Sequence, residues 1–163
     1  MYNVIIFRNV SDKQCKFTDC FKGFENITVV KKLFGEETEK ILSELNVKFF
    51  STGFRYMSVN GRTGNLMINS NYLQKGDERD IYLDIIHELN HVKQFKEGKD
   101  IFDERYQYVD RPTEIEAYTT TVLEAKRIGM TDLEIQEYLD TEWLTANDLR
   151  KLCRSLSLKY TRY

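Results

Sequence analysis

The chain has 163 residues, 41% of them hydrophobic and 31% charged, and its 24 basic and 26 acidic residues give a formal net charge of -2. This length predicts one domain, residues 1–163, with a hydrophobic core of its own. The balanced charge, without a basic face, argues against a nucleic-acid partner. The lack of a long apolar run and of a signal-peptide pattern predicts a cytoplasmic protein without membrane contacts.

The first 46 residues are expected to form an N-terminal extension of mixed structure. Residues 1–7 predict a short strand, because residues 4–7 are all apolar, and residues 8–30 predict a loop with one further strand near residues 27–30. Residues 36–45 predict a helix. Its inward positions recur at helical spacing, at Thr38, Ile41, Leu42 and Leu45.

The cysteines, at positions 15, 20 and 153, are odd in number. With no histidine to spare, they are one ligand short of a separate zinc site built on sulfur. We expect Cys15, Cys20 and Cys153 to be reduced thiols, as in most intracellular proteins. A disulfide between Cys15 and Cys20, which are five residues apart, is the alternative.

Between residues 47 and 69 the apolar period changes to two, which predicts strands over residues 47–51, 54–59 and 65–69. Asn60 and Gly61 start the turn between the last two strands, because an Asn-Gly pair tolerates positive φ. We expect a small antiparallel sheet. Its last strand is expected to be an edge facing the cleft, where a peptide could add as a further strand.

Residues 77–95 contain the motif around which the chain is organised, His87-Glu88-Leu89-Asn90-His91, an H-E-x-x-H pattern that holds both histidines of the chain. On a helix, residues four apart lie one turn apart on the same face, where two imidazoles can bind one zinc ion. Glu88 can then take a proton from a water that the metal activates. The helix itself is predicted by an apolar stripe at Ile81, Ile85, Leu89 and Val92.

A catalytic zinc site needs a third protein ligand. The pattern H-E-x-x-H-x-x-G-x-x-H is excluded, because Gln94 and Glu97 stand where its glycine and its third histidine would be. A carboxylate or a thiolate must therefore complete the site, and the next predicted helix, residues 113–128 after Pro112, offers two glutamates.

Glu114 and Glu116 lie on different faces of that helix. Glu116 belongs to a polar stripe with Thr120, Glu124 and Arg127, as expected of a solvated face. Glu114 instead shares its face with apolar residues, and a buried carboxylate is costly without a partner such as a metal ion. Glu114 is the predicted third ligand and Glu116 the alternative.

Further side chains are candidates for supporting roles. A tetrahedral intermediate needs a hydrogen-bond donor besides the metal, and Tyr106, Tyr108 and Tyr118 are candidates without a ranking among them. Asp84, three residues before His87, could orient an imidazole. The alternative is that Asp84 is a solvated surface acid.

After a loop over residues 98–111 and the glutamate helix, the C-terminal part is expected to be helical. Thr131 and Asp132 are capping residues for a helix over residues 133–139. A last helix is predicted from residue 146 to about residue 158, followed by a tail, residues 159–163.

The chain resembles the gluzincins, zinc peptidases with two histidines from H-E-x-x-H and a glutamate from a following helix. Glu114-x-x-Ala117 is similar to the E-x-x-A-D segment of membrane-bound CaaX-processing and heat-shock gluzincins, with Tyr118 in place of the aspartate. In size and order the chain resembles the minigluzincins more closely. The resemblance covers about residues 47–128 and implies a zincin-like α+β fold, with a catalytic core over residues 47–128 and C-terminal helices and tail over residues 129–163.

These observations predict a zinc-dependent endopeptidase that holds one zinc ion and hydrolyses peptide or protein substrates. The resemblance also implies that a C-terminal segment can cover the cleft, as in a zymogen. One alternative is a catalytically silent zinc-binding regulatory or interaction protein with a metallopeptidase fold. The other is a structural helical domain without a metal.

Overall fold

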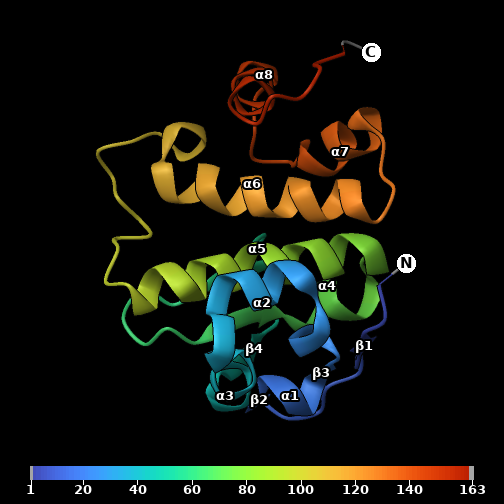
Figure 1. The fold of residues 1–163 in the computed structure, drawn as a ribbon, viewed down its shortest axis with the longest axis vertical. Helices are drawn as coiled ribbons and strands as arrows, with labels where there is room; N and C mark the ends of the chain where they lie inside the picture. The colour runs from blue at the N-terminus through green and yellow to red at the C-terminus, as the bar shows by residue number, and fades with distance from the viewer. Residues whose placement is uncertain (1, 162–163) are drawn as a thin grey trace.

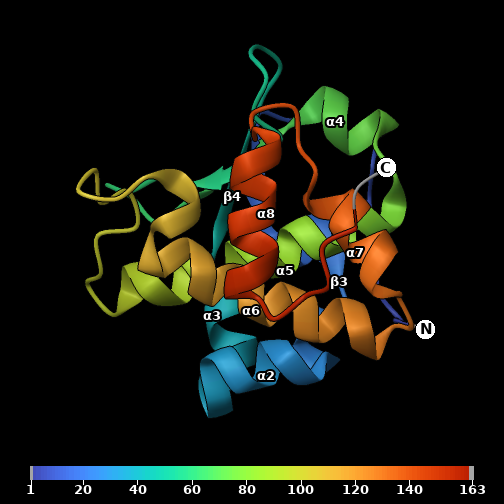
Figure 2. The same cartoon turned by 90° about the horizontal axis from the view of Figure 1, so that it is seen from above.

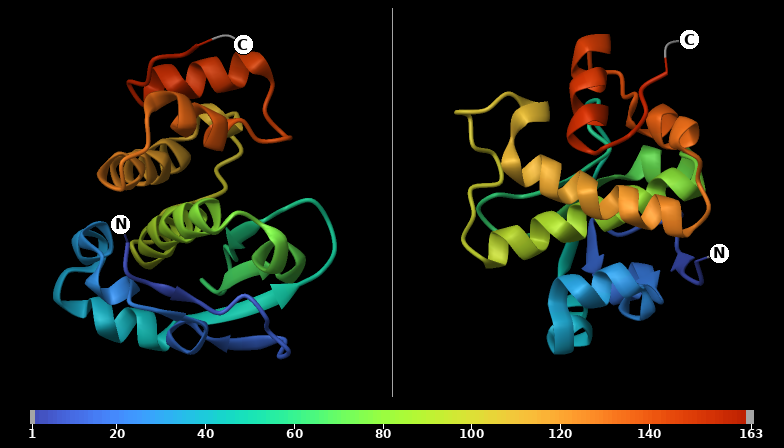
Figure 3. Two further views of the ribbon diagram at one scale, coloured as in Figure 1. Left: turned by 90° about the vertical axis from the view of Figure 1, so that its right-hand side faces the viewer. Right: turned by 45° about the horizontal axis from the view of Figure 1, so that its top comes forward.

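The computed structural model describes residues 2–161, and the predicted α+β class is confirmed. Helix α5 (Glu78–Lys96) runs through the middle of the molecule (Figure 1). The strands and the N-terminal helices lie on one side of it (Figure 3), and α6 (Pro112–Arg127), α7 (Asp132–Leu139) and α8 (Ala146–Ser155) lie on the other. Because α5 is covered from both sides, most of its side chains are buried, polar ones included.

Most of the strands form one four-stranded sheet of order β2-β4-β6-β5. These strands are β2 (Gln14–Lys16), β4 (Asn46–Phe50), β5 (Met57–Val59) and β6 (Leu66–Asn69). The pair of β5 with β6 is antiparallel as predicted, whereas β4 pairs with β6 in parallel. β2, which pairs antiparallel with β4, lies in the segment that was expected to be a loop, so that expectation is wrong here. The parallel pair arises because β5 runs outside β6, so that β6 returns in the direction of β4.

The expectation that the last strand is the edge of the sheet is wrong. β6 lies inside the sheet, with Leu66 and Ile68 fully buried, and β5 is the edge strand on that side. β5 also packs against α5. The order of the strands depends on packing between apolar side chains that are far apart in the sequence. The local alternation of apolar and polar residues does not determine it.

The turn between β5 and β6 differs in one detail from the prediction. The residue with positive φ is Gly64, at 72°, and not Gly61. Asn60 holds the turn, since its side-chain oxygen accepts hydrogen bonds from the backbone of Arg62 and Thr63. A Cβ atom at Gly64 would lie 2.5 Å from the ring of Phe95, so glycine is also needed to bring the turn against α5.

The strand predicted near residues 27–30 is wrong, because this segment begins α2 (Thr28–Phe34). Its run of β-branched residues favours a strand locally. The buried side chains, however, recur at intervals of three and four, which turns one apolar face of a helix toward α5. These side chains are Ile27, Val30 and Phe34.

The rest of the N-terminal part is built from short elements. The strand predicted over residues 1–7 is present only as a two-residue strand, paired antiparallel with a second one. The helix predicted over residues 36–45 is confirmed, and its four predicted inward positions are buried. The elements are β1 (Ile5–Ile6), α1 (Phe17–Cys20), β3 (Phe21–Lys22), η1 (Phe24–Asn26), η2 (Gly35–Glu37), α3 (Thr38–Glu44) and, before α5, α4 (Ser70–Lys75).

The expectation of three reduced cysteines is wrong for two of them. Cys15 and Cys20 form a disulfide, and Cys153 is a buried free thiol. The single turn of α1 folds the chain back after β2 and brings the two Cα atoms to 6.7 Å, within the range that a disulfide can span.

The C-terminal helices begin as predicted. Thr131 caps α7 and Thr145 caps α8, each through a capping box. α8 ends at Ser155, three residues before its predicted end. The following residues return along α7, where Gln136 exchanges two hydrogen bonds with the backbone of Thr161. Of the predicted tail, residues 162–163 lie outside the described residues.

One side chain of the predicted polar stripe on α6 is not solvated. Glu124 is fully buried, accepts a hydrogen bond from the hydroxyl of Tyr82 on α5 and pairs with Arg127. The hydroxyl of Tyr82 reaches Glu124 from the neighbouring helix and gives its carboxylate a hydrogen-bond partner, so that a polar side chain can be buried at this position. Within residues 2–161 no helix combines the length and the apolar character needed to cross a bilayer.

Candidate metal centre

The H-E-x-x-H helix is formed as the sequence predicts. Asp77 caps α5 by accepting hydrogen bonds from two backbone N–H groups of its first turn. The predicted apolar stripe is buried, which fixes the rotation of the helix about its axis. His87 and His91 therefore project from the α5 face that meets α6, and they are 6% and 5% exposed.

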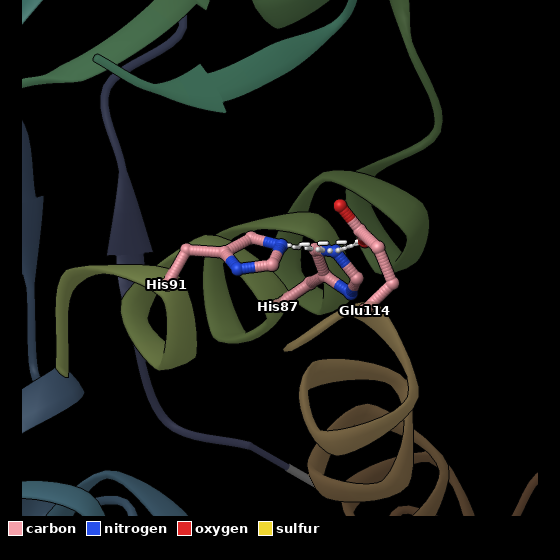
Figure 4. Close-up of side chains that lie close together, drawn as sticks. All are labelled: His87, His91 and Glu114. Carbon is pink, nitrogen blue, oxygen red and sulfur yellow. Dashed lines mark hydrogen bonds and ion pairs between the residues drawn. The ribbon is translucent and has the colours of Figure 1, made fainter. Parts of the chain in front are cut away.

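Glu114 comes to the same place from the first turn of α6. Arg111 precedes the helix, Pro112 occupies its first position, and Glu114 is 5% exposed. The two imidazoles and the carboxylate converge from the two helices (Figure 4). Glu116 lies apart from them: its side chain is 39% exposed and pairs with Lys99 at 3.0 Å.

The three converging donor atoms form a nearly equilateral triangle. Nε2 of His87 lies 3.1 Å from Nε2 of His91 and 3.2 Å from Oε2 of Glu114, and the third side measures 3.3 Å. A tetrahedral ion with bonds of about 2.0–2.2 Å holds its ligands about 3.3–3.6 Å apart. The buried cluster of His87, His91 and Glu114 is therefore able to hold a metal ion with small adjustments.

The charges in the cluster favour a cation between these groups. Burial lowers the pKa of His87. For His91 burial acts in the same direction, but the neighbouring carboxylates of Glu114 and Glu88 outweigh it and raise the pKa to about 9. Although burial opposes it, the two imidazoles hold the pKa of Glu114 well below its usual range. A metal ion would replace the proton on His91 and meet a carboxylate that is already ionised.

Glu88 lies beside the cluster without being part of it. It is 7% exposed, and its Oε2 atom has no hydrogen-bond partner within residues 2–161. Burial raises the pKa of its carboxyl to about 8. The positive charge of a metal ion held by the neighbouring cluster would lower this pKa, and the ionised carboxylate with its unpaired oxygen would then be suited to accepting a proton from water.

Two of the three candidate tyrosines lie at the cluster. The ring of Tyr118 packs on the imidazole of His87, with 4.3 Å between ring centroids, and its hydroxyl lies 2.8 Å from that of Tyr108. Burial raises the pKa of both hydroxyls, which keeps them protonated. Tyr106 is exposed on the loop before α6 and takes part in none of these contacts.

Asp84 contacts neither imidazole and is not a solvated acid. Its carboxylate accepts hydrogen bonds from the hydroxyls of Tyr72 at 2.6 Å and Tyr138 at 2.7 Å. Burial raises its pKa to about 6, although these two hydrogen bonds act against the shift. Asp84 therefore joins α4, α5 and α7 at the end of the cluster nearest the start of α5.

An Asp84→Asn substitution should change how stability depends on pH. The pKa of an aspartate in an unfolded chain is about 3.9, whereas the pKa of Asp84 in the folded protein is about 6. The free energy of unfolding therefore falls as the pH rises between these two values. Between pH 4 and pH 7 the free energy of unfolding of the metal-free wild type should fall by about 2 kcal/mol relative to that of the variant, a value reduced to allow for partial solvent contact. Urea unfolding of both proteins at several pH values measures this difference. A difference that stays constant would show that Asp84 titrates normally.

Two residues at the cluster were missed by the sequence reasoning. Oε1 of Gln94 lies 2.7 Å from Nδ1 of His91, and Nη1 of Arg111 lies 3.8 Å from Oε1 of Glu114. Each stands three residues from the ligand that it contacts, a spacing that places side chains next to each other on a helix. This three-residue spacing is the feature of the sequence that could have identified both residues.

The α7–α8 connection reaches the same end of the cluster. The ring of Trp143 meets Tyr56, which precedes the edge strand β5, and Tyr56 stacks on Tyr72 with 4.3 Å between ring centroids. Seen from above (Figure 2), this connection runs from α7 toward α4 before α8 turns back across α6. Together with the Tyr138 contact to Asp84, it holds residues 138–143 against α4 and α5.

No family model, no curated protein and no solved structure matches the chain.

Proposed function

We propose that the protein is a zinc-dependent peptidase. The observation that carries the proposal is the buried triangle of two imidazole nitrogens and one carboxylate oxygen, with the unpaired carboxylate of Glu88 beside it. Catalytic zinc in peptidases can be held by two histidines and one carboxylate, with a separate acidic residue nearby that does not bind the metal. Zinc is the proposed metal because nitrogen and carboxylate ligands in a tetrahedral arrangement suit it best.

Each residue has a proposed role. Zinc, when bound to His87, His91 and Glu114, supplies a Lewis acid that polarises the substrate carbonyl and lowers the pKa of water. Glu88 accepts the proton of the attacking water and later gives it to the leaving amine. The hydroxyl of Tyr118 or Tyr108 donates a hydrogen bond to the oxygen on which negative charge develops.

The sheet offers a place for an extended substrate. β5 is the edge strand of the four-stranded sheet and packs against α5, so we propose that a peptide adds as a further strand along its outer side. Such pairing binds the peptide backbone, which is common to all peptide and protein substrates, and it supports an endopeptidase activity.

The burial of the cluster favours a second candidate, a metal-binding protein whose site is closed by its own chain. The three ligands and Glu88 are only 5–7% exposed. Residues 138–143, the end of α7 and the start of the connection to α8, lie against α4 and α5 through Tyr138 and Trp143. We propose this segment, more than the tail, as the cover. The enzyme is then latent, or it works only as a regulatory or interaction protein.

A peptide-library assay separates these functions. We expect the zinc-loaded Trp143→Ala variant to cleave peptides at least about tenfold faster than the wild type, because the ring that holds the connection against Tyr56 is gone. Mass spectrometry of the products measures the cleavage, and a chelator should stop it until zinc is restored. Leu133→Ala, which also removes an exposed apolar side chain, is the control. If both the wild type and Trp143→Ala bind zinc but neither cleaves a peptide, the silent metal-binding protein is favoured.

A further inference from the structure

Gln94 makes a set of contacts that the metal ligands alone do not explain. It is fully buried on α5, one turn after His91, and its amide lies between that histidine and the first turn of α6. Its Nε2 atom donates to the backbone oxygen of Thr113 at 2.9 Å and to Oε2 of Glu116 at 3.0 Å. Its Oε1 atom lies 2.7 Å from Nδ1 of His91.

The partners on α6 determine which way this amide points. The backbone oxygen of Thr113 can only accept hydrogen bonds. Oε2 of Glu116 also accepts, because it receives a hydrogen bond from Nζ of Lys99 at 3.0 Å, and an ammonium group can only donate. Two acceptors on one side require the NH₂ group of Gln94 to face α6. Its oxygen is therefore left facing His91.

An oxygen in that position determines which nitrogen of the imidazole carries a hydrogen. Since Oε1 of Gln94 only accepts, Nδ1 of His91 must carry a hydrogen to make the 2.7 Å contact. In the neutral imidazole the lone pair is then on Nε2, the atom that faces His87 and Glu114. Thr113 is also the residue directly before Glu114, so the same amide ties the position of the third ligand to the second.

We propose that Gln94 is a positioning residue of the metal centre, a role that rests on the proposed metal site and not on peptidase activity. It holds His91 in the tautomer that can bind a metal through Nε2, and it couples that imidazole to the first turn of α6. His87 has no such support, because its Nδ1 atom has no hydrogen-bond partner within residues 2–161. Of the two imidazoles, only that of His91 is oriented by a hydrogen bond to a supporting residue, so the metal affinity depends on Gln94.

The test is a comparison of Gln94→Met with Asn90→Leu in the full chain. Both substitutions remove a buried amide that links α5 to α6, since Asn90 donates to the hydroxyl of Thr120 at 2.7 Å, but only Gln94 touches a histidine. Competition with a chromogenic chelator measures the affinity for zinc. We expect Gln94→Met to bind zinc about 10–100-fold more weakly than the wild type, and Asn90→Leu to stay within about twofold.

Proton NMR of the zinc-loaded proteins gives a second readout that does not depend on the measured affinity. The Nδ1 hydrogen of His91 should give a slowly exchanging resonance, which Asn90→Leu retains and Gln94→Met loses. Absence of this resonance in the wild type, or an equal loss of affinity in both variants, overturns the positioning role. A wild type that binds no zinc removes the metal site, and with it both this role and the proposed function. A wild type that binds zinc with an affinity that Gln94→Met leaves unchanged removes only the role of Gln94.

Discussion

Zinc-loaded Glu88→Gln should keep its metal and lose about 10²–10⁴-fold in turnover. The amide of glutamine has nearly the same shape as the carboxyl, but it cannot accept the proton of the attacking water. Because Glu88 lies beside the cluster and is not one of the three converging ligands, its replacement should leave metal binding intact. Cleavage of a library-derived peptide and the zinc content of the same sample measure the two effects.

Glu78→Gln is the matched control for this experiment. It makes the same chemical change on the same helix, at an exposed position ten residues earlier, and should leave turnover unchanged. If the wild type is closed by residues 138–143, both variants are compared in the Trp143→Ala background. Full turnover in Glu88→Gln would exclude Glu88 as the general base, whatever the metal content.

The second large effect is expected at the third ligand. Glu114→Ala should weaken zinc binding by more than about 100-fold, which exceeds the loss usually caused by removing a group that only supports a ligand. The reason is that one corner of the donor triangle disappears, which leaves two imidazole nitrogens 3.1 Å apart on a single helix. Elemental analysis after gel filtration, together with chelator competition, measures the zinc content and the affinity.

Glu116→Ala provides the comparison for Glu114→Ala. Glu116 stands two residues later on the same helix, and its carboxylate pairs with Lys99 and Gln94, away from the triangle. We expect this variant to keep about one zinc ion per chain, because Thr113 still accepts the hydrogen bond from Gln94. Zinc retained by Glu114→Ala but lost from Glu116→Ala would assign the third ligand to Glu116 and contradict the geometry.

The features that local sequence predicted well are those with a strong helical period. The apolar stripe of α5 predicted both the helix and its rotation, and the spacing of His87 and His91 then placed both rings on one face. The apolar face of α6 separated Glu114 from Glu116 in the same way. Here the neighbours that matter are three or four residues apart, so the sequence alone contains the information.

Other features depended on residues that are far apart in the chain. The strand predicted near residues 27–30 became part of α2, because its apolar face packs on α5. β6 lies between β4 and β5, which no local alternation indicates. Asp84 was expected near an imidazole or in solvent, and it is held instead by Tyr138, 54 residues away.

The sequence by itself therefore determined the helices that carry the candidate ligands and the faces from which these side chains project. Only the tertiary structure decided that the donor atoms of His87, His91 and Glu114 converge to 3.1–3.3 Å, and that the amide of Gln94 meets His91 from the other side. The physical reason is that helical periodicity is a property of neighbouring residues. The approach of α6 to α5 depends instead on packing across the whole core, where each helix must bury its apolar face against the other.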